Sequence, residues 1–365
     1  MSFEILGIGT ASPAYQIEQA DAADIAKEVC LDDEKQKRQM VALYRRSGVK
    51  TRYSVLLDSP GPGTEDRQTF YQRITSSDDK GPGTAARMAE YETHAPQLAL
   101  EAARKSLQSG NVDPAEITHL VTVSCSGFAA PGFDIELMRE LGLSGETART
   151  HVGFMGCHGA LNGLRVARSF AESNPNATVL VCAVELCSLH HQYGWNPQQI
   201  VANSLFADGA AAVVGRAGSD SKSSDCWQII SNGSRLIPDS REMMSWRIGN
   251  NGFEMSLSPE VPTLIKQCLP DWIDNWLGQY QLEVDQIKSW IIHPGGPRIL
   301  QATGECLNLT EAQVAPSQKV LEELGNMSSP TILFIMERLQ NSQAELPCVV
   351  LGFGPGLVVE AALIQ

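Results

Sequence analysis

The sequence has 365 residues, of which 43% are hydrophobic and 19% charged, and its formal net charge is −14. This length allows two packed halves with substantial cores, and the composition is typical of a globular enzyme rather than of a disordered or fibrous chain. The negative charge argues against nucleic acid as a partner, because such binding depends on Lys and Arg neutralising phosphates.

No segment of the sequence indicates a membrane protein or a metalloprotein. The chain opens on Met1-Ser2-Phe3 without a basic segment ahead of an apolar run, and no apolar run is long enough to span a membrane. The nine cysteines are scattered without a Cys-x-x-Cys pair, which argues against a disulfide framework and a zinc site. We therefore expect a cytoplasmic protein with no membrane insertion and no metal.

Strands and helices alternate along the first half, which predicts an α/β fold. Short apolar strands are predicted at 4–9, 118–124, 150–154, 178–185 and 210–215. Helices are predicted at 84–107 and 160–173. Because these strands are apolar on both faces, we expect a sheet that is covered on both sides.

A small, polar stretch at 216–224 is the best candidate boundary, so we divide the chain into 1–220 and 221–365. The second part repeats the order of elements, with strand material at 226–237, a helix at 261–279, a strand at 289–293, helices at 297–307 and 330–340, and strands at 348–352 and 357–363. Pro/Gly pairs bracket an irregular segment at 60–83, to which no role can be given.

Cys157 lies in a glycine-rich segment, GFMGCHGALNG at 153–163, between a predicted strand and a predicted helix. A helix N-terminus lowers the pKa of a thiol, and the thiolate is the nucleophilic form. His293 in IIHPGGP and Asn326 in GNMSSP are candidate partners. Each residue alone could be a buried thiol, a turn histidine or a helix cap. Together they favour covalent catalysis by the cysteine.

Four cations, Arg45, Arg46, Lys50 and Arg52, occur within eight residues. They are compatible with a cationic helix end. They are equally compatible with a site for a phosphorylated ligand such as coenzyme A.

Five motifs occur in one order: the Cys157 segment, DGAAA at 208–212, HPGGP at 293–297, GNMSS at 325–329 and GFGPG at 352–356. With them the chain resembles the type III polyketide synthases, the chalcone synthase-like enzymes, over essentially its whole length. The resemblance implies a thiolase fold of two similar βαβ-rich halves with a layered α-β-α-β-α core. It also implies a homodimer that uses an acyl-CoA starter and malonyl-CoA without an added cofactor.

The resemblance assigns Cys157 as the nucleophile that carries the acyl group, and His293 as the imidazolium that keeps its thiolate ionised. His293 and Asn326 would then donate hydrogen bonds to the malonyl thioester oxygen and stabilise the enolate formed by decarboxylation. Phe206 and Phe253 match the gate between the coenzyme A tunnel and the cavity.

Further positions match the substrate cavity and the coenzyme A site of the family. The cavity positions are Cys125, Ser126, Cys187, His190, Met244 and Ser328. Those matched to coenzyme A phosphates are Arg46, Lys50 and Arg52. Several cavity positions differ from the plant enzymes, and ELCSL at 185–189 and SWRIG at 245–249 resemble bacterial members.

The bacterial character favours an alkylpyrone or alkylresorcinol made from a fatty acyl starter, followed by a naphthalene made from malonyl units and then by a chalcone. The starter, the number of extensions and the mode of ring closure stay open.

A ketoacyl synthase III-like enzyme, performing one condensation on an acyl carrier protein, is the alternative. A hydroxymethylglutaryl synthase, a non-catalytic thiolase-fold scaffold and a papain-like protease fit the sequence less well.

Overall fold

The computed structural model describes residues 2–31, 33–63, 67–76, 78–218 and 227–365. Its centre is a nine-stranded sheet in the order β11-β12-β13-β8-β1-β7-β6-β4-β5. The first half of the chain supplies β1 (Phe3–Ala11), β4 (His119–Ser124), β5 (Ala148–Gly153), β6 (Thr178–Leu186) and β7 (Asp208–Ala217). The second half supplies β8 (Gln228–Leu236), β11 (Ser289–Ile292), β12 (Cys348–Gly354) and β13 (Val358–Ile364).

The two halves of this sheet repeat one topology. In the first half β4 pairs parallel with β6, which pairs antiparallel with β7, which pairs antiparallel with β1. In the second half β11, β12, β13 and β8 pair in the same order and directions. A short antiparallel contact between β1 and β8 joins them. The expectation of two similar halves is therefore confirmed, while the boundary expected at 220/221 lies outside the described residues.

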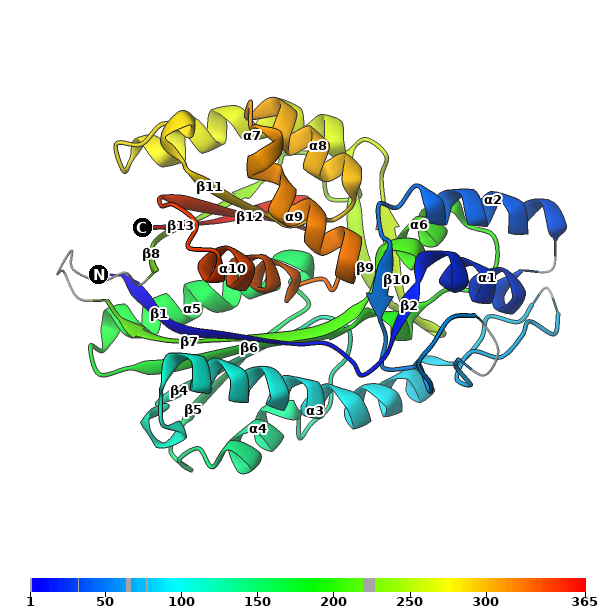
Figure 1. Cartoon of the computed structure of the whole chain (residues 1–365), viewed down its shortest axis with the longest axis horizontal. Helices are drawn as coiled ribbons and strands as arrows, with labels where there is room; N and C mark the ends of the chain where they lie inside the picture. The colour runs from blue at the N-terminus through cyan, green and yellow to red at the C-terminus, as the bar shows by residue number, and fades with distance from the viewer. Residues whose placement is uncertain (1, 32, 64–66, 77, 219–226) are drawn as a thin grey trace.

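Helices divide the molecule into five layers, as Figure 1 shows. Helices α5 (Gly159–Ser173) and α10 (Thr331–Asn341) lie between the two halves of the sheet. Helices α3 (Thr84–Gly110) and α4 (Phe133–Leu141) cover one outer face, and α7 (Val261–Gly278) and α8 (Pro297–Cys306) cover the other. Helix α9 (Glu311–Leu324) packs beside α8 and α10.

Strand β6 shows how the sequence specifies these layers. Val179, Val181 and Ala183 belong to the inner core, together with α5 and α10. Leu180 and Val184 alternate with them and pack into the core under α3. Because successive strand side chains point to opposite faces, a continuously apolar strand must be covered on both. This confirms the covered sheet for β6.

Strand β5 departs from that expectation. The sequence predicted a buried apolar strand at 150–154, but most side chains of β5 are exposed. It is the edge strand beyond β4, so it has a paired neighbour on one side only.

Apart from α4 and α9, the helices and strands that the sequence did not predict gather at one end of the molecule (Figure 1). They are α1 (Gln19–Cys30), α2 (Glu34–Arg45), α6 (Pro197–Leu205), the pair β2 (Gln16–Glu18) and β3 (Thr51–Tyr53), and the hairpin of β9 (Met244–Gly249) and β10 (Gly252–Leu257). The described part of the chain also contains the 3-10 turns η1 (Pro114–Glu116), η2 (Gly156–His158), η3 (Cys187–His190) and η4 (Val284–Gln286). No helix within the described ranges has the length and apolarity to cross a membrane.

Candidate active site

Cys157 lies in η2, at the sharp connection between β5 and α5. The chain turns there through positive φ angles at Phe154 (57°) and Gly156 (75°). A Cβ on Gly156 would lie 2.3 Å from Pro355, so this position requires glycine. The turn directs Cys157 inward, and the residue is only 9% exposed.

Asn326 and Ser328 bring a second segment to the Cys157 thiol. The Asn326 amide N–H donates to the Leu205 carbonyl at 2.8 Å, which fixes the segment beside the end of α6. The Asn326 Oδ1 accepts from the Ser328 amide at 2.8 Å, so its Nδ2 group is left to donate. The Ser328 hydroxyl lies 3.6 Å from the Cys157 Sγ and donates to it. The Cys157 thiol therefore faces the Asn326 side-chain amide and the Ser328 hydroxyl, on a segment that hydrogen bonds of its own backbone amides hold in place.

His293 follows the last residue of β11, where its backbone N–H donates to the Leu351 carbonyl at 2.8 Å. The residue is 1% exposed. Among the described residues, neither ring nitrogen of His293 has a hydrogen-bond partner. A buried imidazole without partners is unusual, because buried polar groups are nearly always hydrogen bonded. Both nitrogens are therefore available to a substrate.

Burial shifts the pKa values of both Cys157 and His293. Burial raises the pKa of the Cys157 thiol to about 11, although hydrogen bonds from Ser328 and Asn326 oppose the rise. Burial also lowers the pKa of His293 to about 3. Desolvation disfavours the charged form of each group. Among the described residues His293 makes no hydrogen bond to Cys157, so the thiolate–imidazolium pair stays a prediction.

Cys157 opens into a small cavity of about 20 Å³. Six residues that the sequence matched to the cavity or its gate line it: Cys125, Ser126, Cys187, Phe206, Met244 and Ser328. Pro355, from the GFGPG loop, also lines it, and sequence reasoning missed three others: Glu185, Trp246 and Met255. Phe253 and His190 are absent from this wall.

Glu185 is the most informative of the missed residues. It is fully buried, and its carboxylate accepts from the backbone amides of Cys125 and Ser126, both at 2.9 Å. It also accepts from the hydroxyls of Ser126 at 2.6 Å and Ser329 at 2.7 Å. A single carboxylate inside the apolar strand TVLVCAVEL was the signal that could have revealed it.

Phe253 belongs to an aromatic cluster next to the cavity at Cys157. Its ring centroid lies 5.8 Å from that of Trp246, which in turn lies 6.0 Å from that of Phe206. Phe253 is fully buried, and Phe206 is half-buried. The two residues matched to the gate are therefore linked through Trp246, which the sequence did not single out.

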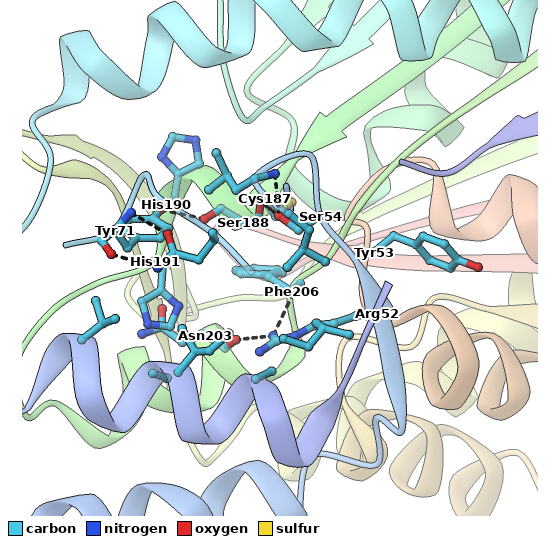
Figure 2. Close-up of a pocket in the computed structure, with 18 residues that line it drawn as sticks. Arg52, Tyr53, Ser54, Tyr71, Cys187, Ser188, His190, His191, Asn203 and Phe206 are labelled. Carbon is cyan, nitrogen blue, oxygen red and sulfur yellow. Dashed lines mark hydrogen bonds between the residues drawn. The ribbon is translucent and has the colours of Figure 1, made fainter. Parts of the chain in front are cut away.

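A second cavity, of about 100 Å³, lies on the other side of Cys187 and Phe206, which line both cavities. Figure 2 shows polar residues that line it, among them Arg52, Asn203, Tyr71 and His191. The apolar lining comes largely from α1 and nearby segments: Ile17, Ala22, Ile25, Ala26, Val29, Leu56 and Leu57. Tyr71 and Gln68 give the irregular 60–83 segment a structural place, as part of this wall.

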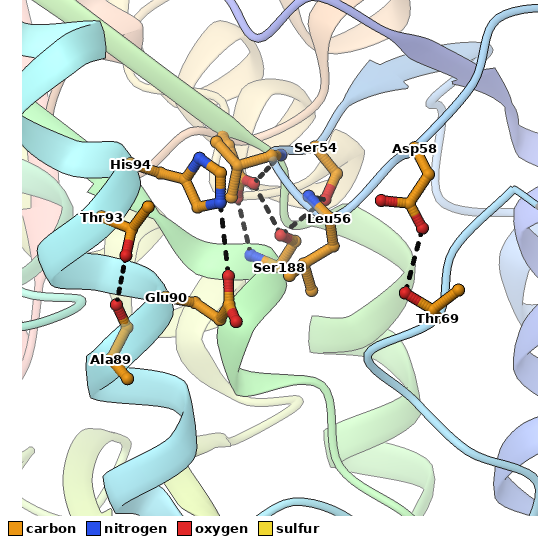
Figure 3. A network of polar contacts seen from close by, with 11 residues as sticks. Ser54, Leu56, Asp58, Thr69, Ala89, Glu90, Thr93, His94 and Ser188 are labelled. Carbon is orange, nitrogen blue, oxygen red and sulfur yellow. Dashed lines mark hydrogen bonds and ion pairs between the residues drawn. The ribbon is translucent and has the colours of Figure 1, made fainter.

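A polar network holds the loop above the second cavity (Figure 3). The Ser54 hydroxyl donates to the Ser188 hydroxyl at 2.7 Å, and the Leu56 amide donates back to Ser54 at 3.1 Å. The Ser188 hydroxyl donates to the Asp208 carboxylate at 2.6 Å. Asp208, in the DGAAA motif, therefore fixes the cavity wall.

The cations matched to coenzyme A separate into two kinds. Arg46 and Lys50 are exposed, and Lys50 pairs with Glu322. Arg52 is 8% exposed, and its guanidinium donates to the carbonyls of Asn203 at 2.5 Å and Phe206 at 3.0 Å. Because its guanidinium is buried and already donates to two carbonyls, Arg52 fits a structural role better than contact with a phosphate.

Comparisons with known proteins place this geometry in a family. Residues 2–220 match the N-terminal domain of chalcone and stilbene synthases, and residues 228–365 match the C-terminal domain. The chain is 30% identical over 365 residues to a 1,3,6,8-tetrahydroxynaphthalene synthase of Streptomyces peucetius subsp. caesius, covering 99% of this chain and 92% of that protein. It is also 30% identical to the alpha-pyrone synthesis polyketide synthase-like Pks18 of Mycobacterium tuberculosis, covering 99% and 90%.

A solved structure agrees with these relatives. The crystal structure of PKS-I from the brown alga Ectocarpus siliculosus superposes with a TM-score of 0.91 at 29% identity, covering 100% of this chain and 99% of that one. The chain therefore belongs to the chalcone and stilbene synthase family and is a type III polyketide synthase.

Proposed function

We propose that this enzyme loads an acyl group from coenzyme A onto Cys157 and extends it repeatedly with malonyl-CoA. The observation that carries the proposal is the Cys157 thiol, enclosed with the Asn326 amide, while the buried His293 ring keeps both nitrogens free. The reaction uses coenzyme A thioesters and needs no added cofactor, because loss of carbon dioxide itself supplies the carbanion.

In the loading step, His293 takes the thiol proton as the Cys157 sulfur attacks the acyl carbonyl carbon. The carbon–sulfur bond to coenzyme A breaks, and the leaving thiolate recovers the proton from His293. The low pKa of a buried imidazole makes proton transfer costly in the free enzyme, so loading and deprotonation occur together once the thioester is bound.

In the extension step, the bond between the malonyl α-carbon and its carboxylate breaks, and carbon dioxide leaves. The electron pair passes into the thioester as an enolate, whose oxygen accepts hydrogen bonds from Asn326 Nδ2 and His293. The enolate carbon then attacks the Cys157 thioester and expels the Cys157 thiolate. The chain has grown by two carbons and returns to Cys157 for the next cycle.

The second cavity supports an apolar starter. A catalytic cavity of about 20 Å³ is too small for an acyl chain, and the neighbouring space of about 100 Å³ has an aliphatic wall. Movement of Phe206 and Cys187 would join the two spaces. We therefore favour an alkylpyrone or alkylresorcinol from a fatty acyl starter over a naphthalene and a chalcone, although similar proteins are named for naphthalene and alpha-pyrone products.

Coenzyme A would reach this site past the exposed Arg46 and Lys50. The loop that contains Arg46 and Lys50 packs against the start of α8, because a Cβ on Gly48 would lie 3.7 Å from the Pro297 side chain. Arg298 is the next residue and is exposed. It adds a cation that sequence matching did not include, and it can replace Arg52 as a phosphate contact.

A second copy of the chain is the expected partner. Phe128, Phe154 and Met155 are 51%, 40% and 38% exposed, beside the Cys157 turn. Phe128 and Phe154 are in ring contact, and the edge of β5 leads directly into Phe154. An apolar group next to an open sheet edge is typical of a surface that another subunit covers. The mass of the purified protein in solution tests this homodimer.

The function is tested by incubating the enzyme with malonyl-CoA and acyl-CoA starters of increasing length, and by identifying products by mass spectrometry. Pyrones or resorcinols that require an intact Cys157, and are lost in Cys157→Ala, would support the proposal. A single condensation that depends on malonate bound to an acyl carrier protein would replace it with the ketoacyl synthase III-like alternative.

A further inference from the structure

The imidazole of His190 makes hydrogen bonds through both ring nitrogens and contacts two aromatic rings, although it does not line the cavity at Cys157. Its Nε2 lies 2.6 Å from the Ser126 carbonyl oxygen, and its Nδ1 lies 2.9 Å from the Phe253 amide nitrogen. The residue is 4% exposed. It thereby connects η3, the cavity wall at Ser126 and strand β10.

These two partners determine the tautomer of the ring. A carbonyl can only accept and a backbone amide can only donate, so Nε2 carries the hydrogen and Nδ1 presents its lone pair. Burial lowers the pKa of His190 to about 3, so the ring stays neutral and keeps that lone pair at neutral pH. The amide of Phe253 therefore has a permanent acceptor.

The same ring also supports the Phe253 side chain. The two rings are stacked with centroids 4.2 Å apart and planes 12° apart. Trp246 contacts His190 edge-on at 5.3 Å. Gln192 completes the support, because its Nε2 donates to the Phe253 carbonyl at 3.2 Å. Residues 190–192 thus hold Phe253 by its amide, its carbonyl and its ring.

This support matters because the β9–β10 hairpin forms a two-stranded sheet separate from the nine-stranded one. Within the described ranges its strands pair only with each other, so the position of Phe253 depends on contacts with loops and helices rather than on the main sheet. Another tie, between Thr84 and residues 249–252, holds the turn of the hairpin. At Phe253 itself, His190 binds the amide and stacks on the ring, while Gln192 binds the carbonyl.

We propose that His190 is a positioning residue that holds the Phe253 gate, and that it thereby restricts which acyl starters enter. The gating part rests on the proposed function, whereas the positioning part concerns only the geometry of β10. His190 belongs to the wall of the second cavity. A looser Phe253 would therefore widen the route beside the space where an acyl chain is expected to lie.

Two variants separate the contacts of the ring. His190→Phe keeps an aromatic ring for stacking and removes both hydrogen bonds, whereas His190→Gln removes the ring and keeps a donor and an acceptor. His190→Leu is a second variant without either hydrogen bond, for use if His190→Phe does not fold. His119→Ala is the matched control, because His119 stacks on Phe170 at 4.3 Å and belongs to β4 rather than to the gate.

Hydrogen exchange of the peptide covering residues 250–257, read by mass spectrometry, tests the positioning without any activity. We expect exchange to rise by about tenfold in His190→Phe or His190→Leu, and to stay within about threefold of wild type in His190→Gln and His119→Ala. Unchanged exchange in His190→Phe and His190→Leu, or an equal rise in His190→Gln, would overturn the proposal.

Kinetics test the gating. In His190→Phe, kcat/KM for a long acyl-CoA relative to a short one should rise by about fivefold, with kcat for the short starter within about twofold of wild type. His190→Gln should restore the wild-type ratio. An unchanged ratio in His190→Phe would refute gating by His190. A wild-type enzyme that forms no product would instead refute the proposed function, and the exchange measurement would still decide the positioning.

Discussion

The protonation state of the Cys157 thiol is open to direct measurement. Burial raises the pKa of Cys157 to about 11. The thiolate fraction is then about 10⁻⁴ at pH 7 and about 10⁻² at pH 9, and only the thiolate reacts with an alkylating reagent. Alkylation of Cys157 by iodoacetamide should therefore accelerate by about tenfold per pH unit between about pH 7 and 10. Restricted access lowers the rate at every pH equally and leaves this slope unchanged.

The assay follows the Cys157 peptide by mass spectrometry, which separates it from the buried thiols of Cys125 and Cys187. Cys157→Ser identifies the background. A preformed pair with His293 would give a rate that is flat between about pH 6 and 8, and His293→Ala would turn that flat profile into a steep one. A flat profile in the wild type would refute the neutral pair. A steep profile that His293→Ala leaves unchanged would support it.

Three other contacts have consequences that can be measured by chemical unfolding. A Cβ at Gly354 would lie 2.3 Å from Cδ2 of His158, so Gly354→Ala should lower the free energy of unfolding by about 1–3 kcal/mol; His158→Ala in the same chain should recover part of it, and simple addition of the two losses would contradict the contact. Arg52→Met should lower the free energy of unfolding by about 2–3 kcal/mol, because it leaves the carbonyls of Asn203 and Phe206 unpaired. Lys50→Ala, at an exposed position, should not shift the midpoint of unfolding. Full stability of Arg52→Met would instead favour Arg52 as a contact to coenzyme A. Glu185→Ala leaves several buried donors unpaired and should cost at least about 2 kcal/mol; a stable variant would show that water replaces the carboxylate.

The apolar strands of the first half predicted an α/β sheet covered on both sides, whereas the layered arrangement of two similar halves was implied by the resemblance to type III polyketide synthases. Strand β6 illustrates the covered sheet, since both of its faces meet a core. The hairpin of β9 and β10 was not predicted, because its six-residue strands carry no continuous apolar run and its burial depends on distant segments. The exposure of β5 also depends on its place at the edge of the sheet, which composition does not reveal.

The motifs identified residues around the Cys157 thiol, but they did not reveal the ionisation or burial of the side chains. Asn326 and Ser328 lie beside the Cys157 thiol, whereas His293 makes no hydrogen bond to it among the described residues. The ionisation of Cys157 could not be read in the same way, because desolvation depends on everything packed around the sulfur. Arg52 shows the same limit: spacing placed it among cations, and burial against Phe206 decided its role.

Trapping the acyl enzyme tests the central claim most directly. The enzyme is incubated with one acyl-CoA starter alone, and the modified peptide is mapped before and after malonyl-CoA is added. The account predicts an acyl thioester on Cys157 that disappears as extended product forms, and no such adduct in Cys157→Ala. An acyl group carried on another residue, or extended product formed by Cys157→Ala, would contradict it.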